Sequence, residues 1–170
     1  MAELTFDPRE AVKSLFTELS SRSRFVIKKR FGLDSKSNST LEAIGKIHGI
    51  TRERVRQIEE AALQTIKDSD AFKQLAPNLE EIKRVVERYG GVVHEQEFLN
   101  HISADPVVQN NLHFLLVLGD AFTKLKEDDS FHHRWTIDER LTQLVHQSIK
   151  NLARSLSADD LLSEKDLLAA

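Results

Sequence analysis

One stretch constrains this chain more than any other: residues 49–59, which read GITRERVRQIE. In a helix beginning after Thr51, apolar residues recur every three or four positions and form one stripe that must pack against another element: Val55, Ile58, Ala62 and Ile66. Long polar side chains fall on the opposite side at the same spacing: Arg52, Glu53, Arg56, Gln57 and Glu60. The plainest interpretation of the second set is a solvated helix face of mixed charge.

The residue types on that polar side indicate a more specific role. Arg can bridge the two acceptors of guanine, Gln can pair with adenine, and Glu can accept a hydrogen bond from the amino group of cytosine. Arg54 lies off the centre of the polar side, where its guanidinium would reach a phosphate. The pattern therefore predicts a helix that reads base edges in the major groove.

A recognition helix needs a helix in front of it, and the preceding residues supply one. The capping-box pattern at residues 39–42 predicts a helix start with Ser39 or Thr40 as the cap and Glu42 in the first turn. Gly49 would end that helix in a left-handed turn. We expect three residues to form the inner face: Leu41, Ile44 and Ile47. A short helix, a glycine turn and a second helix make a helix-turn-helix.

The residues of this motif resemble region four of the bacterial sigma-70 family. The resemblance is carried by two runs in the motif itself, TLEAIG at residues 40–45 and ITRERVRQIE at residues 50–59. A third run, RFGLD at residues 30–34, resembles the segment that joins the two halves of region four. The resemblance covers about residues 7–72. It implies that the second helix enters the major groove at the minus-35 promoter element, with Arg52, Glu53 and Gln57 at base edges and Arg54 and Arg56 at phosphates or flanking positions. The candidate DNA-binding set is Thr40, Thr51, Arg52, Glu53, Arg54, Arg56 and Gln57.

The resemblance also implies a protein partner and a limit. Region four docks on the β flap of RNA polymerase through a face opposite its recognition helix, and by analogy Val12, Leu15 and Phe16 would serve that contact if exposed; burial in the core is the alternative. No aromatic, basic segment that could melt a minus-10 element is found. We therefore do not expect a complete sigma factor.

Charge is distributed unevenly along the chain. Residues 1–76 carry 14 Lys or Arg against 11 Asp or Glu, whereas residues 77–170 carry 10 against 16. A part that binds a phosphate backbone should be relatively basic, and the first part is. Lys28, Lys29 and Arg30 form a basic cluster in it, which is either a solvated face or a phosphate contact. The acidic second part favours a protein partner or self-association.

The second part has the order of a winged helix. We expect a helix from Asn78, capped with the help of Glu81, then a short strand at Val92 and Val93, two helices, and a β-hairpin whose alternating residues point to one side: Phe131, His133, Trp135 and Ile137. About residues 79–137 resemble, in layout and hydrophobic pattern, the HARE type of winged helix-turn-helix, which includes a domain of the polymerase delta subunit. The helix that would read DNA there, residues 106–118, has no Lys or Arg.

The sequence predicts a mainly α protein with three parts. Residues 1–76 form a sigma-region-4-like helix-turn-helix domain, residues 77–156 a winged-helix domain with a small hairpin wing and a C-terminal helix that Asp138 caps, and residues 157–170 an acidic tail or the start of a further segment. The chain has no Cys, no leader-like segment and no apolar run of membrane-spanning length, so we expect a cytoplasmic protein without a membrane partner.

No residues form a catalytic or metal-binding pattern. His132 and His133 are adjacent on the expected hairpin and would point to opposite faces, which suits chelation poorly. We expect no enzyme activity, no cofactor and no metal. The function that we expect is that of a transcription regulator that reads double-stranded, promoter-like DNA. The alternative is a sigma-mimicking module that binds RNA polymerase or another regulator without reading DNA.

Overall fold

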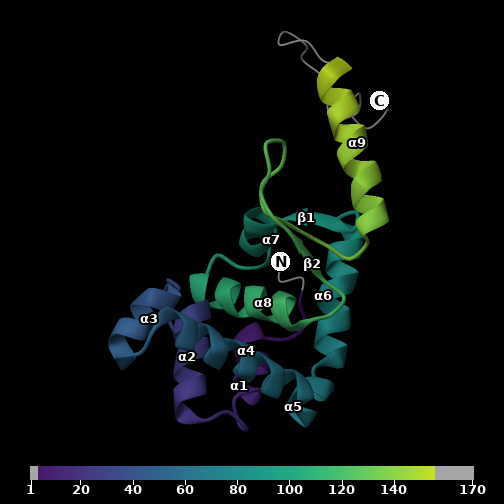
Figure 1. Cartoon of the computed structure of the whole chain (residues 1–170). Helices are drawn as coiled ribbons and strands as arrows, with labels where there is room; N and C mark the ends of the chain where they lie inside the picture. The colour runs from purple at the N-terminus through teal and green to yellow at the C-terminus, as the bar shows by residue number, and fades with distance from the viewer. Residues whose placement is uncertain (1–3, 156–170) are drawn as a thin grey trace. The chain divides into compact units, whose positions relative to one another are not determined.

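The computed structural model describes residues 4–155, and helices account for most of them (Figure 1). The elements follow in this order: α1 (Pro8–Ser14), α2 (Ser21–Phe31), α3 (Leu41–His48), α4 (Arg52–Asp68), α5 (Asp70–Gln74), α6 (Ala76–Arg88), β1 (Val92–His94), α7 (Glu95–Ile102), α8 (Pro106–Leu118), β2 (Thr123–Leu125), β3 (Arg134–Thr136) and α9 (Glu139–Ser155). The predicted mainly α class is confirmed. No helix within residues 4–155 is long and apolar enough to cross a bilayer.

The helix ends of the N-terminal part follow their local sequence. The Thr40 hydroxyl accepts a hydrogen bond from the Ala43 amide, and the Thr51 hydroxyl accepts one from the Arg54 amide, each at 3.1 Å. These bonds cap α3 and α4, because the first amides of a helix have no partner within it. Gly32 and Gly49 end α2 and α3 in the left-handed conformation, at φ 66° and 63°. The predicted start and end of α3 and the predicted start of α4 are confirmed.

Two local predictions are wrong. Ile47 is not on the inner face of α3: it is 61% exposed, because Leu41 and Ile44 already fill the space between α3 and its neighbours. Asn78 does not cap a helix, since α6 already begins at Ala76 with Pro77 in its first turn. Proline suits that position because its missing N–H would have had no partner there.

Three short strands form one antiparallel sheet in the order β1–β3–β2. Trp135 in the central strand faces Val93 on one side and Lys124 on the other. The predicted short strand and hairpin are confirmed, although β3 starts only at Arg134, so Phe131 and His133 lie in the preceding loop. The order α6, β1, α7, α8, β2, β3 is that of a winged helix. The narrower resemblance to HARE-type domains stays a prediction.

Arg134 explains why the strand is short. Its guanidinium donates to the carbonyl oxygens of Lys126 at 3.1 Å and His132 at 2.9 Å, and to the Asp128 carboxylate at 2.8 Å. These bonds gather residues 126–133 into a loop around a nearly buried cation. The loop satisfies the charge, which is why this Arg can be buried on the sheet.

The main hydrophobic core contains residues from both sides of the expected domain boundary between residues 76 and 77. It joins Val12, Leu15 and Phe16 to the inner face of α8, where Phe114 is fully buried. The Phe114 ring centroid lies 4.7 Å from that of Phe31 and 6.4 Å from that of Phe16. A division of the chain into residues 1–76 and 77–156 stays a prediction, and in the structure α1 and α2 share their core with α8.

The chain divides into two compact units. The first ends at Ile137, and the second begins at Asp138. The second unit contains α9, and the Asp138 carboxylate accepts hydrogen bonds from the Arg140 and Leu141 amides at 2.8 and 3.1 Å. Asp138 therefore caps α9 as predicted. The predicted acidic tail at residues 157–170 lies outside the described residues.

Candidate nucleic-acid interface

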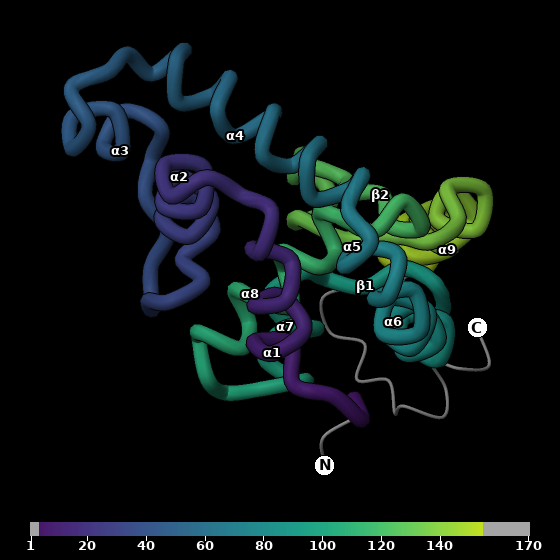
Figure 2. The backbone as a smooth tube through the Cα atoms, turned by 90° about the horizontal axis from the view of Figure 1, so that it is seen from below, coloured from purple at the N-terminus to yellow at the C-terminus, as the bar shows by residue number. Residues whose placement is uncertain are grey.

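A small apolar core of its own holds the helix-turn-helix together. Val26, Ile44 and Val55 are each fully buried and come from α2, α3 and α4. Four partly buried side chains surround them: Phe25, Leu41, Ile50 and Ile58. Figures 1 and 2 show that α3 and the start of α4 lie at the end of the first unit that is away from the strands. The apolar stripe predicted for α4 is thus turned inward, and its other side is left to solvent.

The first two turns of α4 present the predicted polar set on that solvent side. Five side chains lie there, all exposed: Arg52, Glu53, Arg54, Arg56 and Gln57. Thr40 and Thr51 are also exposed, but their hydroxyls cap α3 and α4. Their structural role is therefore to fix the ends of both helices, which places the α4 face relative to α3.

The polar side chains of α4 pair with one another. Arg56 donates to the Glu53 carboxylate at 2.9 and 2.7 Å and also pairs with Glu60. These contacts raise the pKa of Arg56 above its usual value, and the Arg56 hydrogen bond lowers the pKa of Glu53. Arg54 donates to the Gln57 side-chain oxygen at 3.0 Å. Such exposed pairs one turn apart are weak, because water screens both charges, so they exchange readily for contacts to a ligand.

Arg52 differs from its neighbours because it makes no hydrogen bond or ion pair within residues 4–155. It stands at the first position of α4, next to the Thr51 cap. Its guanidinium is therefore available as a five-donor fork at the helix end that would point into a groove.

The structure separates the members of the predicted basic cluster. Lys28 pairs with Asp34 at 2.8 Å, and Arg30 lies 3.5 Å from Glu59. Lys29 is exposed and lies over the Phe25 ring, 5.9 Å from its centroid. Burial raises the pKa of Glu59, in spite of Arg30. Lys29 is therefore the member of the cluster best placed for a phosphate.

Sequence reasoning did not single out the loop between α2 and α3 as part of a candidate interface. Lys36, Ser37 and Asn38 are exposed there, immediately before the Thr40 cap, and Lys36 has no ion-pair partner among the described residues. The sequence signal was weak, because a short polar stretch before a helix is typical of any loop.

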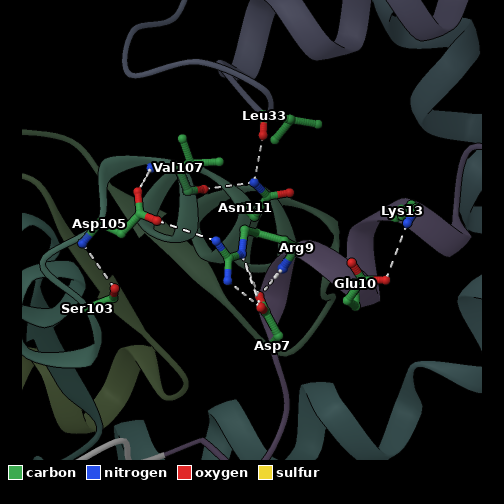
Figure 3. A network of polar contacts seen from close by, with 9 residues as sticks. All are labelled: Asp7, Arg9, Glu10, Lys13, Leu33, Ser103, Asp105, Val107 and Asn111. Carbon is green, nitrogen blue, oxygen red and sulfur yellow. Dashed lines mark hydrogen bonds and ion pairs between the residues drawn. The ribbon is translucent and has the colours of Figure 1, made fainter.

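α8, the helix that reads DNA in many winged helices, faces inward. Its apolar side is buried, and Asn111 donates to the carbonyl oxygens of Leu33 and Val107 at 2.9 and 2.8 Å (Figure 3). Figure 3 also shows Arg9 of α1 reaching Asp7 and, at 3.5 Å, Asp105, the cap of α8. The N-terminal part of the same chain therefore packs against α8.

The apolar residues considered for a polymerase contact are buried as well. Val12 and Leu15 are 1% exposed and Phe16 is 6% exposed. They pack in the core that α1 shares with α8, which agrees with the alternative of burial and leaves very little of their surface exposed. Among residues 4–155, no group of three or more His, Asp or Glu side chains is arranged to hold a metal ion.

Comparison with known proteins finds matches to the N-terminal part of the chain. The family model for sigma-70, region 4 matches residues 15–68. The RNA polymerase sigma factors SigA of Listeria monocytogenes, Listeria innocua and a Bacillus species are each 40% identical to this chain over 72 residues. That alignment covers 42% of this chain and 19% of each relative, so the chain spans about a fifth of their length. Residues 15–68, which contain the helix-turn-helix, therefore resemble region 4 of the sigma-70 family.

Proposed function

We propose that this chain is a transcription regulator that binds double-stranded, promoter-like DNA, with the first turns of α4 in the major groove. The observation that carries the proposal is the division of α4 into an inward-facing apolar stripe, buried at Val55, Ala62 and Ile66, and an exposed face bearing Arg, Glu and Gln. Such a helix, held by a cap and a three-residue core, has the shape and the donors that major-groove readout requires. The match to sigma-70 region 4 supports the same conclusion.

Within that proposal, the α4 side chains have different roles. Arg52 and Gln57 contact base edges, and Arg52 breaks no hydrogen bond or ion pair to do so. Glu53 accepts a hydrogen bond from a cytosine amino group. Arg54 and Arg56 contact phosphates. Binding replaces the Arg56 pairs with Glu53 and Glu60 by contacts to a denser array of negative charge, so the small energy of the surface pairs is recovered.

Free cations around the helix-turn-helix support phosphate binding. Lys29, Lys36 and Arg52 make no ion-pair contact with a carboxylate among the described residues, and all three precede the second turn of α4. Elsewhere in the described residues, Lys67, Lys73 and Lys124 are paired with Asp120, Asp70 and Glu95, whereas Lys126 in the loop between β2 and β3 makes no ion pair. Unneutralised cations are therefore found next to the proposed groove-reading face, where counterion release would favour binding.

The test is selection from random duplex DNA at two salt concentrations, followed by affinity measurements on variants. Arg52→Ala and Gln57→Ala should each weaken binding to the selected site by about 1–3 kcal/mol and relax the preference at one position. Arg54→Ala should weaken all sequences alike and reduce the salt slope by about 1. Arg84→Ala, an exposed Arg on α6, is the matched control and should change neither. Recovery of no enriched motif would contradict DNA reading.

A second candidate is a module that binds RNA polymerase, or another regulator, without reading DNA. The observation that favours it is the excess of 16 acidic over 10 basic residues after position 76, including the exposed wing residues Glu127, Asp128 and Asp129. A variant with Arg52, Arg56 and Gln57 all changed to Ala separates the two. Capture of polymerase by that variant, with DNA binding lost, would support a separate protein contact; loss of both would not.

A further inference from the structure

Two side chains of α8 hold the loop between α2 and α3. Asn110 donates to the carbonyl oxygens of Gly32 and Ser35, each at 3.0 Å, and Asn111 donates to that of Leu33 at 2.9 Å. Asn111 is 3% exposed, and Figure 3 shows it between Leu33 and its own helix. Three loop carbonyls are thus bound by residues more than 70 positions later in the chain.

The contact is closely fitted. A Cβ at Gly32 would lie 2.8 Å from the Asn110 side-chain nitrogen and 2.9 Å from the Ser37 carbonyl oxygen. The loop is also bound to itself and to α2: the Ser35 hydroxyl donates to the Ser37 carbonyl at 2.8 Å, and the Ser39 amide donates to the Lys29 carbonyl at 2.8 Å. Residues 32–39 are therefore held in one conformation.

The held loop leads directly into the helix-turn-helix. It ends at Thr40, the cap of α3, and it exposes Lys36, Ser37 and Asn38. In a helix-turn-helix complex the first helix crosses the DNA backbone while the second enters the groove. Lysine, hydroxyl and amide donors beside a helix N-terminus are the groups that contact phosphate oxygens.

We propose that residues 36–38 contact the DNA phosphates, and that Asn110 and Asn111 are the positioning residues that hold this loop ready. The inference rests on the proposed function and adds to it a role for the winged-helix part. α8 does not touch DNA in this proposal. It favours DNA binding because the loop is already ordered, so binding does not have to supply the free energy of ordering it.

The direct contact is tested by Lys36→Ala. It should weaken binding to every duplex about three- to tenfold at low salt and lower the salt slope by about 1, because one phosphate contact is lost. Lys126→Ala, an exposed Lys in the loop between β2 and β3, is the control and should leave the slope unchanged. An unchanged slope for Lys36→Ala would overturn the phosphate contact.

The positioning role is tested in the full chain by Asn110→Ala, with Gln109→Ala as the control on the same helix. Gln109 donates to Asn100 and Ser103 and does not touch the loop. Asn110→Ala should weaken duplex binding about three- to tenfold without changing the selected motif, and Gln109→Ala should not. If Asn110→Ala does not fold, Asn110→Asp, which has the same size but no amide donor, replaces it. Circular dichroism and thermal unfolding establish that each variant is folded at the assay temperature.

A double-variant cycle separates positioning from a general loss of stability. If Asn110 acts through the loop, Asn110→Ala should have a smaller effect on affinity in the Lys36→Ala background than in the wild type. Equal effects in both backgrounds, or wild-type affinity in Asn110→Ala, would overturn the inference while leaving DNA reading intact. Absence of duplex binding by the wild type would instead refute the proposed function.

Discussion

Alanine at the two left-handed helix ends should reveal how tightly α8 holds the loop. Gly32 and Gly49 have nearly the same backbone conformation, at φ 66°, ψ 32° and φ 63°, ψ 34°. Placing Ala in this conformation costs about 1–2 kcal/mol at either site. The loss of backbone freedom in the unfolded chain that accompanies Gly→Ala is also the same for both, so it cancels in the comparison.

The surroundings of the two glycines differ. Nothing lies within 4 Å of a Cβ at Gly49, so Gly49→Ala should cost only the conformational term of about 1–2 kcal/mol. A Cβ at Gly32 would meet Asn110 and Ser37 at 2.8 and 2.9 Å. Overpacking adds about 1–3 kcal/mol, and displacement of the Asn110 hydrogen bond adds about 0.5–1.5 kcal/mol. Gly32→Ala should therefore destabilise the fold by roughly 3–6 kcal/mol.

The assay is urea denaturation, followed by far-ultraviolet circular dichroism and by fluorescence of Trp135, the only Trp in the chain. The double variant Gly32→Ala, Asn110→Ala should lose less than the two single changes predict, because removing the Asn110 side chain opens space for the new methyl group. Equal destabilisation by Gly32→Ala and Gly49→Ala, within about 0.5 kcal/mol, would refute the close fit between α8 and the loop.

Three further predictions concern the core, the wing and the base-reading face. Phe114→Ala should cost about 3–5 kcal/mol and shift the dichroism and Trp135 transitions together, because Phe114 packs against Phe16 and Phe31; two separate transitions would contradict a shared core. Hydrogen bonds from the Ser130 amide and then Arg134 lower the pKa of Asp128 from 3.8 to about 2, so its contribution is fully present above pH 3.8 and is lost as pH falls through about 2. The amide resonances of Ser130 and Phe131 should move over that range, and in Asp128→Asn they should not. Glu53→Gln should tighten binding to random duplexes and relax the preference at one position, as measured by competition; weaker binding to all sequences would argue that Glu53 acts only by holding Arg56.

Much of the helix-turn-helix could be predicted because its signals are local. Thr40 and Thr51 cap helices, Gly32 and Gly49 end them, and the apolar stripe of α4 is buried as its spacing indicated. Each of these depends on residues within about four positions of one another, the range over which helix hydrogen bonds form. The short strand and the hairpin were predictable for the same reason, from alternation and turn residues.

Contacts between distant segments were decided only by the tertiary structure. The exposure of Ile47 depends on how completely Leu41 and Ile44 fill the space beside α2 and α4, which periodicity within α3 does not state. The division of Lys28, Lys29 and Arg30 into paired and free cations depends on where Asp34 and Glu59 come to lie. The sequence showed that α8 has no cations and is rich in amides; that those amides hold the loop before α3 follows from packing α8 against α1 and α2, because a hydrogen bond between residues more than 70 positions apart leaves no periodic trace in the chain.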